Sequence, residues 1–532
     1  MRTSPLLVAA LASGLSAGAP STPEVPLTLA QARALALEKN VELRVEREEA
    51  AAAEAGELRA KGAYDPVLRA DARWRERTDP VNSLLSGAPN GELAPTSSSV
   101  GASLGLAQLL PTGGTITLSS SVYRDRTDGV FAVLSPSWAS SFGVELRQPL
   151  LRSLRTDAAR LGLRVARIDR DRSAASVRRV AAETVAAVER AYWALVAARS
   201  DVAARLSAVE LAERQRVDVA ARIEAGTLSE ADAAAPVAEV ERRKGELLAS
   251  REAEARAGNA LKSLLLADPA DPLWETRVVP SETDGDDLSP SDAPTPDVAG
   301  AETRRPEVAL AAARLEQLAA EDDAATDRVR PQLDLVAGYT GRGLAGERNP
   351  GISPPFPAGD VEVPAALDGG LGRSLGTIGE GRFPDASVGL AFSLPLGNRS
   401  ARADAARVRS ARAQAGLALL RARQQVGVEV RNAVVALETA GQRLAAARAG
   451  GAAAETLLRA EEDRFAAGLT TSFFVLTRQN DLTQARVAET QALADLRRAR
   501  VEYARATGTL LAERQIHVDE SGPADGPTGG PR

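Results

Sequence analysis

Residues 66–75 alternate strictly between apolar and charged side chains. The apolar ones are Leu68, Ala70, Ala72 and Trp74, and the charged ones are Arg69, Asp71, Arg73 and Arg75. Only a repeat of two residues sorts them onto opposite faces, so this segment is predicted to be a β-strand. A strand with one apolar and one charged face fits the wall of a membrane barrel between lipid and water. It fits an edge strand of a soluble sandwich equally well.

Three further segments with the same alternation favour the barrel. They are residues 142–147, 332–340 and 388–394. Four strands cannot close a barrel, and open strand edges are not tolerated in lipid, so several copies of the chain must close it. Three copies with four strands each would give about 12 strands, within the bacterial range. An extra hairpin, residues 100–106 and 115–123, either joins this wall, enters the lumen or lies outside.

The longest predicted elements are two helices, residues 153–225 and 399–467. The first contains no proline and little glycine, and would be roughly 110 Å long at 1.5 Å per residue. Helices of this length need partners along their whole length, and frequent alanine permits close antiparallel packing. The predicted partners are the returning helices 229–265 and 470–514, together with the segments 29–60 and 301–329.

The chain is a tandem duplication. Glu42-Leu43 recurs as Glu307-Val308, and Pro66 as Pro331, each 265 residues later. The predicted organisation is a signal peptide at 1–19, repeat one at 27–265, an acidic Pro-rich connector at 266–300, repeat two at 301–515 and a disordered tail at 516–532. Each repeat consists of a helix, barrel strands and a long helical hairpin. Segments 79–97 and 343–384 are rich in Gly, Pro and Ser and are predicted to be surface loops.

The N-terminus predicts export. Met1-Arg2 precedes an apolar run from Leu6 to Leu15 and the small residues Ala17-Gly18-Ala19, which is the order of a signal peptide with cleavage near Ala19. The run is too short to span a bilayer as a helix, and no later stretch reaches about 18 uncharged apolar residues.

Composition argues against an enzyme. The chain has no cysteine, and its single histidine, His517, lies near the C-terminus. Disulfides and thiolate metal sites are therefore excluded, the usual proton-transfer and metal chemistry is nearly absent, and we expect no catalytic residue, cofactor or metal site. With 65 basic and 71 acidic side chains, nucleic acid is not an expected partner.

An ordered set of motifs resembles the TolC-type outer-membrane efflux protein family. Residues 27–40 (LTLAQARALALEKN) resemble its mature N-terminal helix, 148–152 (QPLLR) and 394–396 (LPL) its strand-to-helix junctions, and the Arg-x-x-x-Gly turns at Gly226 and Gly468 its periplasmic hairpin tips. The resemblance runs from about Leu27 to Arg514. It implies an α+β membrane protein: a trimeric 12-stranded outer-membrane β-barrel that continues into a long periplasmic α-helical barrel. It also implies a homotrimer that works with a periplasmic adaptor (membrane-fusion) protein and an inner-membrane pump, without an active site of its own.

The same resemblance places a gate at the hairpin tips. The candidate tip residues are Arg222, Gly226, Asp232, Arg464, Phe465, Gly468 and Phe474. In the family an aromatic residue precedes the second-repeat glycine by three positions and an acidic residue follows it by six. Here Phe465 keeps the aromatic ring. The position six residues after the glycine is Phe474 in repeat two, and the corresponding position in repeat one is Asp232. A ring of Phe474 side chains would form an apolar constriction, so cation selectivity would rest on Asp232 or be weak. Phe474 also fits simple packing between helices, and the two arginines fit either gate ion pairs or solvated surface positions.

Four aromatic residues are candidate membrane-interface anchors, because ring side chains with polar edges gather at that depth. They are Trp74, Tyr123, Trp138 and Tyr339.

Three functions fit this sequence. The first is the exit duct of a tripartite efflux system, a passive outer-membrane channel with a gated helical tunnel. The second has the same architecture but serves a type I protein secretion system. The third, from another class, is an exported coiled-coil structural protein without a pore. The residues indicate neither the exported substrate nor the class of pump.

Overall fold

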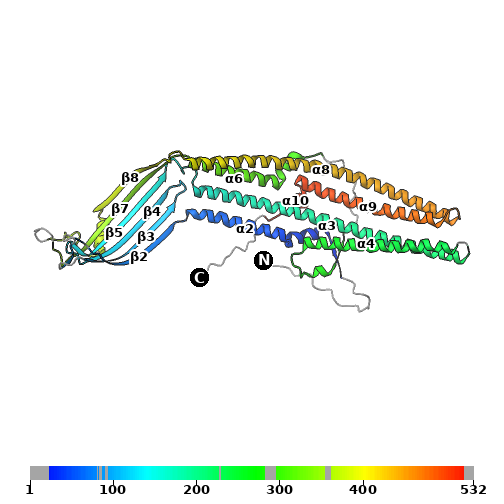
Figure 1. The fold of residues 1–532 in the computed structure, drawn as a ribbon, viewed down its shortest axis with the longest axis horizontal. Helices are drawn as coiled ribbons and strands as arrows, with labels where there is room; N and C mark the ends of the chain where they lie inside the picture. The colour runs from blue at the N-terminus through cyan, green and yellow to red at the C-terminus, as the bar shows by residue number, and fades with distance from the viewer. Residues whose placement is uncertain are drawn as a thin grey trace, which may run out of the picture. The chain divides into compact units, whose positions relative to one another are not determined.

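The computed structural model describes residues 23–80, 82, 87–89, 94–226, 229–281, 295–353 and 361–519 (Figure 1). The predicted signal peptide, the middle of the connector and most of the C-terminal tail lie outside these residues. The chain divides into two compact units. The strand unit comprises residues 50–173 and 310–420, and the helical unit comprises the described parts of 1–49, 174–309 and 421–532.

The strand unit contains one antiparallel sheet of six strands, in the order β2-β3-β4-β5-β7-β8. Their bounds are β2 Val67–Thr78, β3 Thr96–Leu109, β4 Thr115–Thr127, β5 Leu134–Pro149, β7 Gln332–Arg348 and β8 Phe383–Ser393. The four predicted strands are present. The sheet has two strands more than these four, because the extra hairpin, β3 and β4, lies between β2 and β5 as part of the same sheet.

The register sorts side chains of all six strands onto two faces, because directly paired residues point to the same side. On the apolar face, one row runs from Leu68 through Leu106, Leu118 and Val144 to Tyr339. On the polar face, a neighbouring row runs from Asp71 through Ser103, Ser121 and Ser141 to Arg342. The alternation read from single segments therefore extends across the whole sheet.

One predicted loop contains regular structure. Within 343–384, β7 continues to Arg348, and helix α7 (Leu371–Gly379) packs on β5 and β7. The helix approaches closely because Gly343 has no side chain: a Cβ there would lie 2.0 Å from the carbonyl oxygen of Ser374. The Ser140 and Ser374 hydroxyls are also 2.7 Å apart. The glycines that suggested a loop serve here as the contact surface for a helix.

The long helices agree with the prediction. Helix α3 spans Ala158–Glu224 and α8 spans Arg399–Ala466, and both contribute residues to both units. Helix α8 runs unbroken through Gly416, Gly427, Gly441 and the pair Gly450-Gly451. The returning helices are α4 (Ala234–Leu265), preceded by the short 3₁₀ turn η4 (Glu230–Ala233), and α9 (Ser472–Thr507).

Three segments predicted as single helices are interrupted. Residues 29–60 form α1 (Leu29–Lys39) and α2 (Val41–Lys61), separated at Asn40. Residues 301–329 are divided between α5 (Val298–Arg304) and α6 (Pro306–Arg328). The helix is interrupted at Arg305, because a residue that precedes proline avoids the helical conformation. Helix α9 ends at Gly508, whose φ of 71° is left-handed, and α10 (Leu510–Glu513) follows.

A small parallel sheet was not predicted. Strand β1 (Glu24–Leu27) pairs with β6 (Arg277–Pro280), which lies in the segment predicted to be connector. Strands β1 and β6 share a hydrophobic cluster with helices α1, α3 and α4. In this cluster Tyr192 is fully buried, and its hydroxyl donates to the Leu27 carbonyl. Four-residue strands carry too little alternation to be read from sequence alone.

Buried ion pairs connect segments of the helical unit that are far apart in the chain. The Glu189 carboxylate on α3 is fully buried and accepts from Arg33 on α1 and from Arg514 after α10. Arg305, between α5 and α6, is 5% exposed and donates to Glu307, to Glu429 on α8 and to backbone carbonyls at the end of α9. Burial raises the pKa of the Glu307 carboxyl, but the hydrogen bonds and charge of Arg305 outweigh burial, so the pKa is lowered from its ordinary 4.5.

Among the residues that the structure describes, no helix combines the length and apolar character needed to cross a lipid bilayer.

Replacement of Arg305 by methionine should destabilise the helical unit. Arg305→Met keeps most of the apolar stem but removes the guanidinium that Glu307 and Glu429 share, and leaves Arg505, 3.5 Å from Glu429, as the neighbouring cation. Because both carboxylates are partly exposed, the expected loss is about 1 to 3 kcal/mol. The matched control is Arg459→Met on α8, whose side chain is 73% exposed and pairs only with Glu455 one turn away. Thermal melting followed by helical circular dichroism should show a clear decrease in Tm for the first variant and little change for the second. Equal shifts would contradict this role for Arg305.

Candidate functional site

Two glycines terminate the long helices, and both adopt the left-handed conformation. Gly226 has a φ of 78° and Gly468 a φ of 73°. After α8, the Gly468 amide donates to the Phe465 carbonyl and the Leu469 amide to the Arg464 carbonyl, which is the hydrogen-bond pattern of a Schellman motif. After α3, the Gly226 amide makes the corresponding bond to the Ile223 carbonyl. The predicted turns at the ends of both hairpins are present.

The ends of the two hairpins meet through an arginine and an aromatic ring. The guanidinium carbon of Arg222 on α3 lies 4.1 Å from the centroid of the Phe465 ring on α8, within the range of a cation–π contact. The Phe465 ring is itself buried among Leu458, Val475 and Leu482 of the second hairpin. Arg222 therefore covers the edge of the hydrophobic cluster that closes the end of the α8–α9 hairpin.

The tip arginines pair with carboxylates of their own helices. Arg222 lies 3.1 Å from Asp218, one turn earlier on α3, and Arg464 lies 3.7 Å from Glu461 on α8. Arg222 also contacts the other hairpin through the ring of Phe465.

Asp232 caps a helix. Its side chain accepts a hydrogen bond from the Ser229 amide at 2.9 Å, while the Ser229 hydroxyl accepts from the Ala231 amide at 3.1 Å. This reciprocal arrangement is a capping box at the start of η4. Asp232 is exposed, so its charge remains available to solvent and ions.

Phe473 and Phe474 are exposed at the start of α9, 66% and 51% respectively. Their rings contact each other edge to face, with centroids 5.6 Å apart. Exposed adjacent rings of this kind at a helix start are unusual for a surface in contact with water alone. They do not belong to the buried cluster around Phe465.

The four aromatic residues of the sheet do not share one face. The register places Trp74, Trp138 and Tyr339 on the apolar face, where the ring of Trp138 lies 5.7 Å from the Arg124 guanidinium. Tyr123 pairs with Gly101 and Ala139 on the polar face. Its ring lies over Gly101, where a Cβ would be 2.1 Å from a ring carbon. Tyr123 therefore lies on the opposite face of the sheet from the other three candidate anchors.

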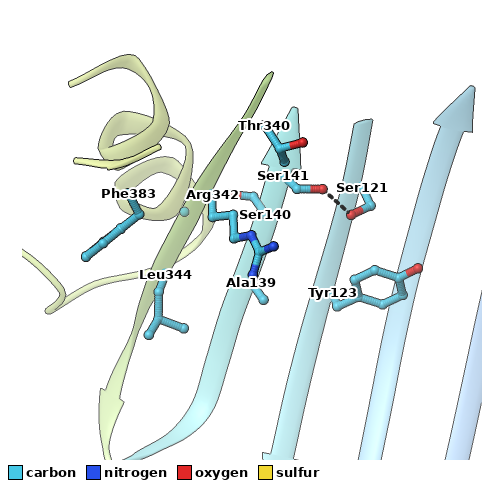
Figure 2. Close-up of a pocket in the computed structure, with 10 residues that line it drawn as sticks. Ser121, Tyr123, Ala139, Ser140, Ser141, Thr340, Arg342, Leu344 and Phe383 are labelled. Carbon is cyan, nitrogen blue, oxygen red and sulfur yellow. Dashed lines mark hydrogen bonds between the residues drawn. The ribbon is translucent and has the colours of Figure 1, made fainter. Parts of the chain in front are cut away.

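Tyr123 instead lines a concavity on the polar face, of about 590 Å³ (Figure 2). Its other lining side chains include Ser121, Ser141, Thr340, Arg342 and Phe383. The Ser121 and Ser141 hydroxyls are hydrogen bonded at 2.7 Å, and Arg342 pairs with Asp385 at 2.8 Å. The sequence analysis missed this site, although Tyr123 has the same parity as Ser119 and Ser121, which already indicates the polar side.

Metal binding has no candidate among the described residues: no three or more His, Cys, Asp or Glu side chains are grouped so that they could hold an ion.

Comparisons with known proteins agree with this architecture. The model of the outer membrane efflux protein family matches residues 299–509. The fold is similar to the CmeC outer membrane channel of Campylobacter jejuni, with a TM-score of 0.62, 16% identity and coverage of 91% of this chain and 86% of that one. It is also similar to the outer membrane protein VceC of Vibrio cholerae, with a TM-score of 0.61, 15% identity and coverage of 90% and 96%.

A third similar structure is the open state of the MtrE outer membrane channel of Neisseria gonorrhoeae, with a TM-score of 0.59, 16% identity and coverage of 93% and 91%. No curated protein matches the sequence. The family match in the second repeat and the shared fold over nine tenths of the chain confirm the resemblance to TolC-type outer-membrane efflux proteins.

Gly468 should be required at the second tip because it adopts the left-handed conformation, and not because a side chain there would clash with a neighbour. A Cβ on Gly468 would meet no atom within 4 Å, so Gly468→Ala should cost only the backbone strain of a left-handed residue, about 1 to 2 kcal/mol. Gly450→Ala on the same helix is the control, because Gly450 also has open space but is helical, and alanine should stabilise it by about 0.5 to 1 kcal/mol. Hydrogen exchange of the α8–α9 tip amides should accelerate in the first variant and not in the second. Unchanged exchange in Gly468→Ala would contradict the assignment.

Proposed function

We propose that this protein is an outer-membrane channel, the exit duct of a tripartite efflux system, with the helical unit in the periplasm. The observation that carries the proposal is the sorting of the six-stranded sheet into one apolar and one polar face, as expected of a wall between lipid and water. A coiled-coil structural protein without a pore would not need this sorting. The family match and the similarity to outer membrane channels support the same function.

The assembly that fits this function is a homotrimer. Strands β2 and β8 are exposed along their whole lengths, and a sheet with free edges is not stable in lipid. Copies of the chain that pair β8 with the next β2 would close the wall into a barrel. The long hairpins of the same copies would then form a helical barrel that meets a periplasmic adaptor and an inner-membrane pump. The pump supplies the energy, and this chain supplies a passage and a gate, so its role is not enzymatic.

The gate is proposed to lie at the hairpin tips. Arg222 over the Phe465 ring holds the α3 tip against the α8–α9 tip within each copy. The exposed rings of Phe473 and Phe474 would face other copies and narrow the mouth with apolar side chains. Asp232 would supply the negative charge near the same end.

Reconstitution tests the proposed function. Mature protein extracted in detergent from the outer-membrane fraction should be a trimer and should produce discrete conductance steps in a planar bilayer. The steps should be small, because the closed tips limit the current. A water-soluble species that leaves the bilayer silent would contradict the proposal.

The Arg222–Phe465 contact should favour the closed state. Phe465→Leu keeps an apolar side chain in the cluster but removes the ring face, and Arg222→Gln removes the cation. Each should weaken the contact by about 0.5 to 1 kcal/mol and raise the mean conductance, and the double variant should add little to either single one. Fully additive increases would show that the two side chains act independently.

The charge of Asp232 should contribute to cation selectivity. Asp232→Asn removes the charge while its amide oxygen can still cap η4, whereas Asp232→Ala removes both charge and cap, at about 1 kcal/mol. The reversal potential in a salt gradient should shift toward zero in both variants by a similar amount. A shift in Asp232→Ala alone would assign the effect to the lost cap, and no shift in either would exclude Asp232 as a filter.

A further inference from the structure

The β3–β4 hairpin is inserted into the middle of the sheet rather than attached to its surface. Every residue of β2 from Val67 to Thr78 faces a β3 residue, and β4 pairs with β5 from Thr115 to Asp125. No direct pairing between β2 and β5 occurs in the strand order. The hairpin therefore separates the two strands of the first repeat and widens the sheet by two strands.

The side chains of the hairpin continue both faces of the neighbouring strands. Its apolar-face residues include Leu106 and Leu118, which lie in line with Leu68 and Val144, and Leu104, which pairs with Ala70 in the neighbouring row. Its polar-face residues are mostly small and hydrophilic and include Ser97, Ser99, Ser103, Thr115, Thr117, Ser119 and Ser121, although Leu109 and Tyr123 lie on the same face. A hairpin that lay in water on both sides would not need this alternation.

The turn of the hairpin is fixed to the start of α3. Arg160 donates to the carbonyls of Thr112, Ser153 and Leu154, and its Nε donates to Asp157. Gly113 has a φ of 82°, and a Cβ there would lie 2.7 Å from Arg160 Nη2 and 2.8 Å from the Ser153 carbonyl oxygen. The turn is thus packed into the junction where β5 leads to α3, on the same end as the other strand-to-helix connections.

The two free edges of the sheet are suited to each other. Strand β2 has 12 residues and β8 has 11, and both are exposed throughout. Because the sheet is antiparallel and has an even number of strands, its first and last strands run in opposite directions. The β8 edge of one copy can therefore pair antiparallel with the β2 edge of the next, with Val388, Leu390 and Phe392 on the same face as Leu68 and Trp74.

We propose that each copy contributes six strands to the membrane wall, and that the β2 and β8 edges form the seam between copies. This inference rests on the proposed function. Three copies with six strands each would form a closed cylinder of about 18 strands, a size at which the interior is a water-filled channel. The membrane segment then does not limit the size of the cargo. Only the helical tunnel and its tips do, and the duct admits bulky solutes at its outer end.

Disulfide trapping tests the seam, and the natural absence of cysteine leaves no background. Arg73→Cys on the polar face of β2 is combined in turn with Asp385→Cys, Ser387→Cys, Gly389→Cys or Ala391→Cys on the polar face of β8. At least one pair should give a ladder on a denaturing gel that ends at three copies. The control, Arg73→Cys with Ser121→Cys on the inner strand β4, should give none. Absence of a ladder in all four pairs, or a ladder ending at another number, would overturn the seam or the count of copies.

Nitroxide accessibility in lipid vesicles tests whether the hairpin is part of the wall. Labels at Leu104 and Leu118 should collide with oxygen dissolved in lipid, and labels at Ser103 and Ser119 with a water-soluble nickel chelate. Val388 and Ser387 on β8 provide the reference for the two faces. If Val388 and Ser387 differ in accessibility but the hairpin labels do not, the six-strand wall is overturned and the proposed function is unaffected. Loss of both contrasts would show that the sheet is not in lipid, and the proposed function would fail with it.

Discussion

The free edges of the sheet are the constraint on which the rest of this architecture depends. Strands β2 and β8 leave alternate backbone amides and carbonyls without partners along their lengths. In water such edges invite uncontrolled pairing, and in lipid they are too costly to leave open. Pairing with identical copies satisfies the backbone groups of both edges, because the β8 edge of each copy then pairs with the β2 edge of its neighbour. In the proposed channel, oligomerisation is thus a condition for the stability of the sheet in a membrane.

The helical unit meets a different demand. Its long helices are rich in alanine and expose much of their surface, so hydrophobic packing is spread thinly in small clusters along them. Buried charges at Glu189 and Arg305 tie segments that are distant in sequence to these helices. Such groups add little net stability compared with apolar residues, but they penalise misaligned packing, because a shift of one helix would leave a buried charge unpaired. We regard register specification as their main role.

Much of the fold could be predicted from the sequence because its elements are long and periodic. The two helices of nearly 70 residues and the four alternating strands carry strong signals, and the duplication confirmed each through its counterpart. The break at Asn40 was missed because it depends on a single side chain that bonds to a distant carbonyl, whereas the break at Arg305 follows from Pro306 and is readable in the sequence. Strands β1 and β6 were too short to show a period. Helix α7 was missed because Gly343 and its neighbours resemble a loop until a helix packs on them.

The candidate site was predictable to a lesser degree. The glycine turns follow from local backbone chemistry, so Gly226 and Gly468 could be located in advance. The contact between Arg222 and Phe465 joins residues more than 200 positions apart, and no local pattern indicates it. Tyr123 was grouped with the candidate membrane-interface anchors by residue type, although its position in the alternation places its side chain on the polar face of the sheet. The extra hairpin could be found in the sequence, but its place in the sheet could not, because alternation within a strand does not show which strands it pairs with.

Electron cryo-microscopy of the protein in lipid nanodiscs tests the central claim most directly. A cross-section through the membrane should show a continuous ring of strands around water, formed by three copies that meet at β2 and β8. Separate sheets with unpaired edges, or particles with no density inside the lipid, would contradict the account.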